Sequence, residues 1–352
     1  MENFIYTGLP ANVVFGQNTT EQLPEEVEKL NISKAVIFTT PEQAQLGEKL
    51  SALLGETSAG IYPHAAMHTP VSVTDKALDF YTQSKADGII AIGGGSTIGL
   101  GKAIALRTDD PQIVLPTSYA GSEMTSIIGQ TEGDRKTTQK TLKVLPETVI
   151  YDVNYTLTLP PRMTITSGMN AIAHAVEALY AEQRNPILSM NAIEGIRKLT
   201  LALRGIAARP DDVETRSDAL YGAMLCAICL GSGGVALHHK LCHVLGGSFN
   251  LPHAETHTVV LPHALAYNAP AVPDTILDLR RATGEDPSTA FYNIAKNNDV
   301  PVSLKELGMP KEGIEKAVHI TLENPYFNPR PLEKDGLLDL LHHAWEGTSP
   351  TS

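Results

Sequence analysis

Short apolar runs alternate with amphipathic stretches along the first 150 residues, and this alternation constrains the fold most. Helical spacing of apolar residues predicts helices at Glu21–Leu30, Gln43–Leu54 and Val73–Ser84. Strands separated by helices form a parallel sheet that is covered on both faces. The polar segment Ser126–Lys143 predicts a hairpin. The runs that predict strands are Asn12–Phe15, Ala35–Thr39, Gly60–Tyr62, Gly88–Ile92, Ile113–Pro116 and Thr148–Tyr151.

The pattern changes after Leu159-Pro160-Pro161, where strand signals almost vanish. Together with a length of 352 residues, this predicts two domains. We expect an α/β domain at residues 1-157, with a Rossmann-like parallel sheet, and an all-α domain at residues 158-352. The expected helices are Met163–Glu182, Asn185–Ala207, Val213–Leu230, Ala236–Gly246, His253–Ala266, Pro273–Thr283, Pro287–Asn297, Ser303–Leu307, Lys311–Thr321 and Leu332–Glu346.

Composition limits the partners and the compartment that we expect. A net charge of -12 argues against binding to nucleic acid, which requires clustered Lys and Arg. No apolar run reaches the roughly 18 residues of a membrane span, and the N-terminus lacks a signal-peptide pattern. Cys226 and Cys229 form a C-x-x-C inside an apolar stretch, where buried thiols are the favoured interpretation. We therefore expect a cytoplasmic chain without nucleic-acid or membrane partners.

A glycine-rich turn follows the strand expected at Gly88–Ile92. Glycines let the backbone approach a phosphate closely, and the helix that follows offers its positive end. An ordinary strand–helix turn is equally consistent with this short motif. The turn lies after a middle strand and position 115 is Leu, so it departs from the standard dinucleotide fingerprint. With a second, hydroxyl-rich turn after Pro116, the expected cofactor-binding residues are Thr40, Gly93, Gly94, Gly95, Ser96, Thr117 and Ser118.

Half of the 12 histidines lie between positions 238 and 263. Imidazole is both a common metal ligand and the usual proton carrier near neutral pH, so the cluster indicates either kind of site. Residues four apart share one face of a helix. Three such pairs favour a functional site over scattered structural histidines: Asn170 and His174, His239 and His243, and His253 and His257.

Four motifs in this order resemble the iron-containing (group III) alcohol dehydrogenase superfamily over nearly the whole chain. They are Gly-Gly-Gly-Ser-Thr-Ile-Gly-Leu-Gly-Lys, Pro-Thr-Ser-Tyr-Ala-Gly-Ser-Glu-Met-Thr, Thr-Ser-Gly-Met-Asn-Ala-Ile-Ala-His-Ala-Val-Glu-Ala and Leu-Pro-His-Ala-Glu-Thr-His. The resemblance implies an N-terminal domain that binds NADH or NADPH, a helical C-terminal domain and a homodimer.

The resemblance also implies where a metal would bind. Metal-dependent relatives hold Fe²⁺ or Zn²⁺ with one Asp and three His, which match Asn170, His174, His239 and His253. His243 matches a further active-site histidine that is not a ligand. An amide is neutral, so metal affinity falls and the histidines could instead be protonated and bind anions. We expect that no metal is required; if one binds, His174, His239 and His253 would hold it.

A finer resemblance concerns the opening Phe-Ile-Tyr-Thr-Gly-Leu-Pro, the histidine-rich segment and Asn-Pro-Tyr-Phe-Asn-Pro-Arg-Pro. These resemble a branch that reduces the C=C bond of an unsaturated oxodicarboxylate during the degradation of aromatic compounds. A small dicarboxylate is thus the expected partner. The expected roles are proton donation and enolate stabilisation for His243 and His253, orientation of carboxylates for His174 and His239, and substrate contact for Asn170, Lys240 and Tyr326.

Other interpretations stay open on the sequence alone. Lys240 could lie on a helix surface, and Tyr326 could be a packing residue. The chain could also be a metal-dependent alcohol or polyol dehydrogenase, a lyase similar to dehydroquinate synthase, or a nucleotide-binding module without catalysis.

Position 40 generates a prediction about cofactor choice. An acidic residue after the first long strand would bind an adenosine 2′-hydroxyl and repel a 2′-phosphate, but Thr40 does neither strongly. We expect NADH and NADPH to be used with kcat/KM values less than about a hundredfold apart, which corresponds to roughly 2.7 kcal/mol. Steady-state kinetics with each cofactor measure this ratio, and a larger preference would contradict the prediction.

Overall fold

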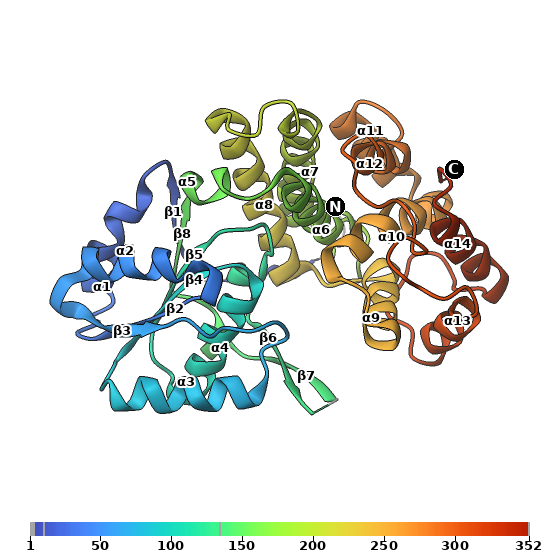
Figure 1. The fold of residues 1–352 in the computed structure, drawn as a ribbon. Helices are drawn as coiled ribbons and strands as arrows, with labels where there is room; N and C mark the ends of the chain where they lie inside the picture. Colours follow the sequence, from blue (N-terminus) through green and yellow to red (C-terminus); the bar gives the residue numbers. More distant parts are fainter. Residues whose placement is uncertain (1–3, 10, 134, 351–352) are drawn as a thin grey trace. The chain divides into compact units, whose positions relative to one another are not determined.

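The computed structural model describes residues 4–9, 11–133 and 135–350, which form two compact units (Figure 1). The first unit is Gly8–Leu159. The second is Pro160–Ser352 together with the N-terminal segment Met1–Thr7. The first holds a parallel sheet and the second is helical, which confirms the predicted fold class.

All six predicted strands belong to one parallel sheet of order β1-β8-β5-β4-β2-β3. The predicted hairpin is also present, as the antiparallel pair β6 (Ile127–Glu132) and β7 (Arg135–Lys140). The sequence did not predict the short helix α5 (Val153–Leu157) that follows the last strand. The strands of the sheet are β1 (Asn12–Gly16), β2 (Ala35–Phe38), β3 (Ser58–Tyr62), β4 (Gly88–Gly93), β5 (Gln112–Pro116) and β8 (Thr148–Asp152).

Successive residues of the central strands point to opposite faces of the sheet, and helices cover both faces. Ile37 and Ile90 pack with α1 (Leu23–Lys29) and α2 (Ala44–Leu54). Their neighbours Val36 and Ile89 pack on the other face, with α3 (Val71–Gln83) and α4 (Gly95–Thr108). A strand buried on both sides cannot show the alternation of a half-exposed one, which explains its continuous apolar sequence.

The strand order reverses beside β2. The chain passes from β2 outward to β3 and then returns to β4 on the opposite side of β2. In open α/β sheets, ligands bind at the carboxyl ends of the strands at such a switch point. Thr40 follows β2 and the glycine-rich turn follows β4, so both lie at this edge of the sheet.

The second unit contains nine of the described helices. One predicted helix, Ser303–Leu307, is wrong: the segment forms turns, and Gly308 follows with φ +89°. A residue in the left-handed region cannot continue a right-handed helix, so Gly308 ends the segment in turns. The helices are α6 (Pro161–Ala178), α7 (Pro186–Ile206), α8 (Val213–Gly233), α9 (Leu237–Phe249), α10 (His253–Asn268), α11 (Pro273–Thr283), α12 (Pro287–Lys296), α13 (Gly313–Glu323) and α14 (Lys334–Glu346).

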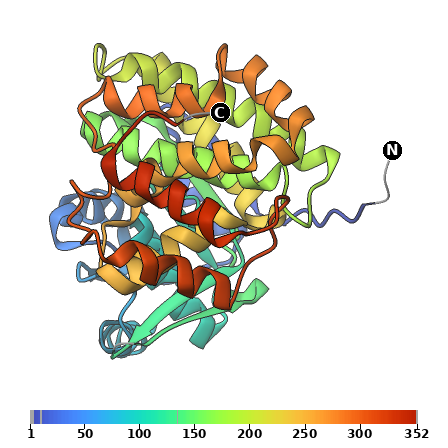
Figure 2. The ribbon, with the colours of Figure 1, turned by 90° about the vertical axis from the view of Figure 1, so that its right-hand side faces the viewer.

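Within this unit, α9, α10, α13 and α14, drawn from yellow to red in Figure 2, contribute side chains to one apolar core. None of the described helices is by itself long and apolar enough to cross a bilayer. The pair α8 and α9, which is bent by 92°, satisfies the length and composition criteria only when its two helices are taken together.

Lys102 joins α4 to the segment that leads into the hairpin. Its buried ammonium donates to the carbonyl oxygens of Thr125 and Ile127 at 2.6 and 3.0 Å, and to the Thr125 hydroxyl at 2.9 Å. Burial lowers the pKa of Lys102 to about 7, and the nearby Glu123 carboxylate opposes this shift.

The Lys102 pKa predicts how stability depends on pH. Between about pH 7 and the ordinary lysine pKa, the unfolded chain binds this proton and the folded chain does not, so the free energy of unfolding rises with pH. From pH 7 to 9, we expect the free energy of unfolding of the natural protein to rise relative to that of Lys102→Met. Urea denaturation of both proteins at several pH values measures this. A constant or falling value of the natural protein relative to the variant would contradict the assigned shift.

Candidate active site

Three helices of the second unit bring six histidines into one cluster, which we call the histidine cluster. Helix α6 carries His174, α9 carries His238, His239 and His243, and α10 carries His253 and His257. Adjacent ring centroids lie 4.3 to 6.2 Å apart. The structure therefore brings the histidines of the three predicted pairs together.

Glu177, one turn after His174 on α6, anchors the cluster. Its Oε2 accepts a 2.6 Å hydrogen bond from the backbone N–H of Ala236, and its Oε1 accepts one of 2.6 Å from that of His238. Oε2 also lies 2.6 Å from Nδ1 of His239. A carboxylate is favoured at the N-terminus of a helix, where N–H groups are unpaired. Glu177 thereby fixes α9 to α6 and turns His239 Nε2 away from itself.

Burial keeps part of the cluster neutral. It lowers the pKa values of His174, His238 and His257 well below the ordinary histidine value, and the neighbouring histidines add to the shift. Positive charge for binding an anion therefore cannot come from these three imidazoles near neutral pH. His243 and His253, by contrast, are exposed.

The exposed rim of the cluster includes residues from the far end of the chain. His243 Nδ1 shares a 3.1 Å hydrogen bond with the hydroxyl of Tyr326, and the Lys240 ammonium lies 5.4 Å from the centroid of the Tyr326 ring. Lys240 is only 8% exposed, so the surface interpretation of this lysine is wrong. Its position on the buried side of α9 places its charge beside the aromatic ring.

Five buried polar atoms at the cluster have no hydrogen-bond partner among the described residues: Asn170 Oδ1, His174 Nδ1, His239 Nε2, His238 Nδ1 and His257 Nε2. Buried polar atoms are normally paired, so these atoms indicate where a ligand binds. Asn170, His174 and His239 offer an amide oxygen and two imidazole nitrogens but no carboxylate, and Glu177 is already engaged by N–H groups and His239. A divalent ion fits these donor types, but it would gain no direct anionic ligand from them.

The predicted cofactor residues lie together in the first unit. A Cβ on Gly93, which has φ +155°, would meet Thr97 Oγ1 at 2.4 Å, so this turn requires glycine. A Cβ on Gly94 would lie 3.1 Å from Ser118 Oγ, which shows how close the two turns are. The sequence missed Gln43, whose side-chain amide donates to Thr117 Oγ1 at 3.0 Å and links the turns after β2 and β5.

The sequence also missed residues of the cluster itself. Glu177 belongs to one of the four motifs of the resemblance, but no sequence pattern indicated that its carboxylate would bind the start of α9. His238 was counted among the histidines, but no role was predicted for it. The Sγ atom of Cys242 lies 3.7 Å from His238 Nε2, and the sequence did not predict this contact.

Comparison with known proteins gives matches over almost the entire chain. Residues 10–153 match the family described as "Iron-containing alcohol dehydrogenase", and residues 164–345 match "Fe-containing alcohol dehydrogenase family, C-terminal". Maleylacetate reductase of Rhizobium sp. (strain MTP-10005) is 50% identical over 99% of this chain and 100% of its own length. The crystal structure of maleylacetate reductase from Agrobacterium tumefaciens superimposes with a TM-score of 0.97, at 48% identity, over 99% of this chain and 100% of that one.

The substitution Glu177→Gln tests whether this carboxylate anchors α9. A carboxamide has only one oxygen, so it cannot accept from the N–H groups of Ala236 and His238 with separate oxygens. At least one N–H donor is then left buried and unpaired, at a cost of about 1–3 kcal/mol. We expect the free energy of unfolding of the helical unit to fall by that order. Fluorescence of Trp345, the only tryptophan in the sequence, reports on this unit during urea denaturation.

The matched control is Glu182→Gln, because Glu182 is exposed and lies shortly after α6. It should leave the urea midpoint nearly unchanged. Equal effects of the two substitutions would show that Glu177 is not an anchor.

Proposed function

Because the chain belongs to the iron-containing alcohol dehydrogenase family, we propose that it reduces the C=C bond of maleylacetate to give 3-oxoadipate, using NADH or NADPH. The observation that carries the proposal is Asn170 and its setting. A neutral amide lies one turn before His174, in a cluster in which burial keeps His174, His238 and His257 neutral and whose rim carries exposed histidines. Full-length similarity to maleylacetate reductases supports the same substrate.

The reaction sets the demands on the site. Hydride from the cofactor adds to the carbon β to the ketone, and the C=C electron pair moves to form an enolate. The enolate oxygen then needs a hydrogen bond or positive charge, and the α carbon takes up a proton. The balance is one hydride and one proton added, with NAD(P)H oxidised to NAD(P)⁺. No alkoxide has to be oxidised, so the reaction depends less on a Lewis acid than alcohol oxidation does.

His243 is suited to donate the proton. It is exposed, and its Nδ1 bonds to the hydroxyl of Tyr326. Burial raises the Tyr326 pKa, so the phenol remains protonated. In the protonated imidazole, Nδ1–H donates to the phenol oxygen and Nε2–H can be given to the substrate, which leaves a neutral imidazole with its hydrogen on Nδ1. Tyr326 is thus a positioning residue for the tautomer of His243.

The other predicted residues surround this donor. We assign His253, also exposed, to the enolate oxygen. Asn170, His174 and His239 offer their unpaired buried atoms to the substrate as hydrogen-bonding groups. Lys240 supplies a positive charge near Tyr326, which suits a carboxylate of the substrate. The deep part of the site therefore contributes hydrogen bonds, and the charge comes from Lys240.

The role of a metal follows from the donor set. If a divalent ion binds, His174, His239 and His253 would hold it and it would polarise the ketone oxygen. Without a carboxylate ligand its affinity falls, and we propose that turnover does not depend on it. We also propose a homodimer in the cytoplasm, in which the cofactor binds through Thr40, Gly93, Gly94, Gly95, Ser96, Thr117 and Ser118.

One assay tests the function. Absorbance at 340 nm, with NADH and maleylacetate, should fall only when both are present. Exhaustive chelation should leave the rate unchanged. Oxidation of an alcohol panel only in the presence of Zn²⁺ or Fe²⁺ would favour a metal-dependent dehydrogenase. Product formation from another substrate without net change in NADH would favour a lyase.

Substitution of His243 tests its role. We expect His243→Ala to lower kcat by about 10²-fold or more, because the general acid is lost. Tyr326→Phe should lower kcat less, because imidazole remains but its tautomer is no longer fixed. His319→Ala is the matched control, since His319 lies on the surface and pairs with Glu323. Near-normal turnover in His243→Ala would remove this residue from the mechanism.

A further inference from the structure

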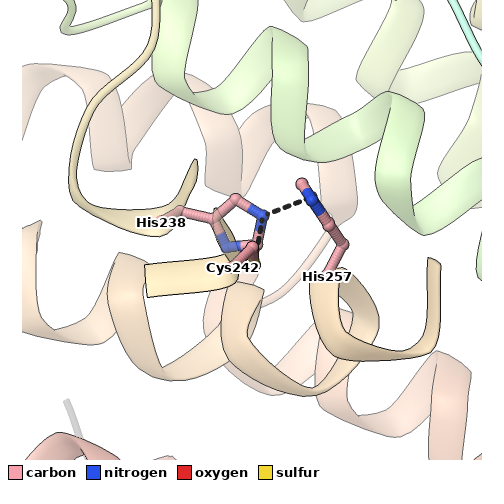
Figure 3. Close-up of side chains that lie close together, drawn as sticks. All are labelled: His238, Cys242 and His257. Carbon is pink, nitrogen blue, oxygen red and sulfur yellow. Dashed lines mark hydrogen bonds between the residues drawn. The ribbon is translucent and has the colours of Figure 1, made fainter. Parts of the chain in front are cut away.

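A second group of metal-ligating side chains is formed by Cys242 and two members of the histidine cluster, on the adjoining turns of α9 and α10. His238 Nε2 is 2.9 Å from His257 Nδ1 and 3.7 Å from Cys242 Sγ (Figure 3). These three atoms all lie within 4.8 Å of one another, and all three residues are buried. His238 and Cys242 are four residues apart on α9, so both face α10 and His257.

The separations suit one small ion. Four-coordinate Zn²⁺ holds nitrogen at about 2.0 Å and sulfur at about 2.3 Å, which implies roughly 3.3 Å between two nitrogens and roughly 3.6 Å between nitrogen and sulfur. The observed 2.9 and 3.7 Å lie within a few tenths of an ångström of those values. The ligand atoms of Cys242 and His257 lie within 4.8 Å of one another, so rotation of the Cys242 side chain would have to bring its sulfur closer to His257. Two imidazoles and one thiolate are ligands that zinc and related borderline-soft ions prefer.

We propose that His238, Cys242 and His257 bind a divalent ion of the Zn²⁺ or Co²⁺ class. This site shares no residue with Asn170, His174, His239 and His253, where metal-dependent relatives would place theirs. The proposal does not depend on the proposed function and goes beyond it.

The protons balance without another reactant. Cys242 loses its thiol proton to solvent when sulfur coordinates the ion. Two neutral imidazoles carry two ring hydrogens, and one of these lies between His238 Nε2 and His257 Nδ1. When the ion binds, this hydrogen moves to the other nitrogen of the ring that carries it, so His238 Nδ1 and His257 Nε2 each hold one hydrogen. Those two nitrogens have no hydrogen-bond partner among the described residues, so both can carry a hydrogen. Nothing is oxidised or reduced.

The surroundings also supply the charge that a buried dication needs. The thiolate neutralises one charge, and the Glu177 carboxylate is hydrogen-bonded to the backbone N–H of His238. With both, the net charge of the buried group is zero, which limits the cost of desolvation. The set containing Asn170 has the same Glu177 nearby but no anionic ligand of its own. Among the described clusters, the thiolate site is therefore the better one for an ion.

Co²⁺ is the probe, because a Co²⁺–thiolate bond absorbs in the near ultraviolet whereas Co²⁺ held by imidazoles alone does not. The full chain is stripped with a chelator, kept reduced with a non-thiol reagent and titrated with Co²⁺. We expect the charge-transfer band to grow until about one equivalent is bound. The band should be lost in Cys242→Ser.

The matched control is the double variant Cys226→Ser, Cys229→Ser, because these are the only other cysteines and both are buried. The band should persist in it. No band in the natural protein, or a band that persists in Cys242→Ser, would overturn the proposal.

If Cys242→Ser does not fold, a measurement on the natural protein still tests the proposal. X-ray absorption of the natural protein loaded with one equivalent of Zn²⁺ should show one sulfur at about 2.3 Å and nitrogen at about 2.0 Å. A shell without sulfur would place the ion at the imidazole set, and two sulfurs would place it at the Cys226 and Cys229 pair. Either result would overturn the proposal.

Discussion

The arrangement of the histidine cluster depends on a carboxylate buried at the start of a helix. Glu177 is completely buried, and it accepts from the backbone N–H groups of Ala236 and His238 and bonds to Nδ1 of His239. The end of α6 and the start of α9 are therefore held by charge-assisted hydrogen bonds, which are stronger than neutral ones. Because one imidazole nitrogen of His239 is occupied, the other has a defined direction and protonation. The position of α9 relative to α6 is thereby fixed, and with it the positions of Cys242 and His243 further along α9.

Periodicity was enough to predict the sheet, since each strand is short, apolar and bounded by turn residues. It failed at Ser303–Leu307, where helix formers occupy a segment that ends at a left-handed Gly308. In the candidate site, too, the sequence predicted local relations but not tertiary contacts. Residues four apart on one helix could be paired from the sequence, as with His239 and His243. The bond between His243 and Tyr326 spans 83 positions, and no local pattern encodes such a tertiary contact.

Burial separates the cluster into two kinds of histidine, and this changes what the Asn170 position means. A carboxylate there could compensate an ion, but it would also add an unpaired negative charge where a dicarboxylate substrate has to bind. An amide keeps a hydrogen-bonding oxygen and removes that repulsion. Neutral His174 and His257 impose no charge of their own. In the proposed site, a substrate with two carboxylates would therefore meet hydrogen-bonding groups in the interior and Lys240 near the rim.

The need of a metal ion for an anionic ligand also explains why the ion is proposed at Cys242 rather than at Asn170. The site of Asn170 lacks an anionic ligand, whereas Cys242 can supply one on the next turn of α9 after His238. An ion there would hold His257, whose ring lies 5.0 Å from that of His239 and 4.3 Å from that of His253. It would thus restrain two histidines of the proposed site without contacting the substrate. Since binding removes the hydrogen from between His238 and His257, the hydrogen of His257 would lie on Nε2 when the ion is present. The ion would therefore fix the tautomer of one imidazole in the interior of the cluster, while His243 on the rim keeps its bond to Tyr326.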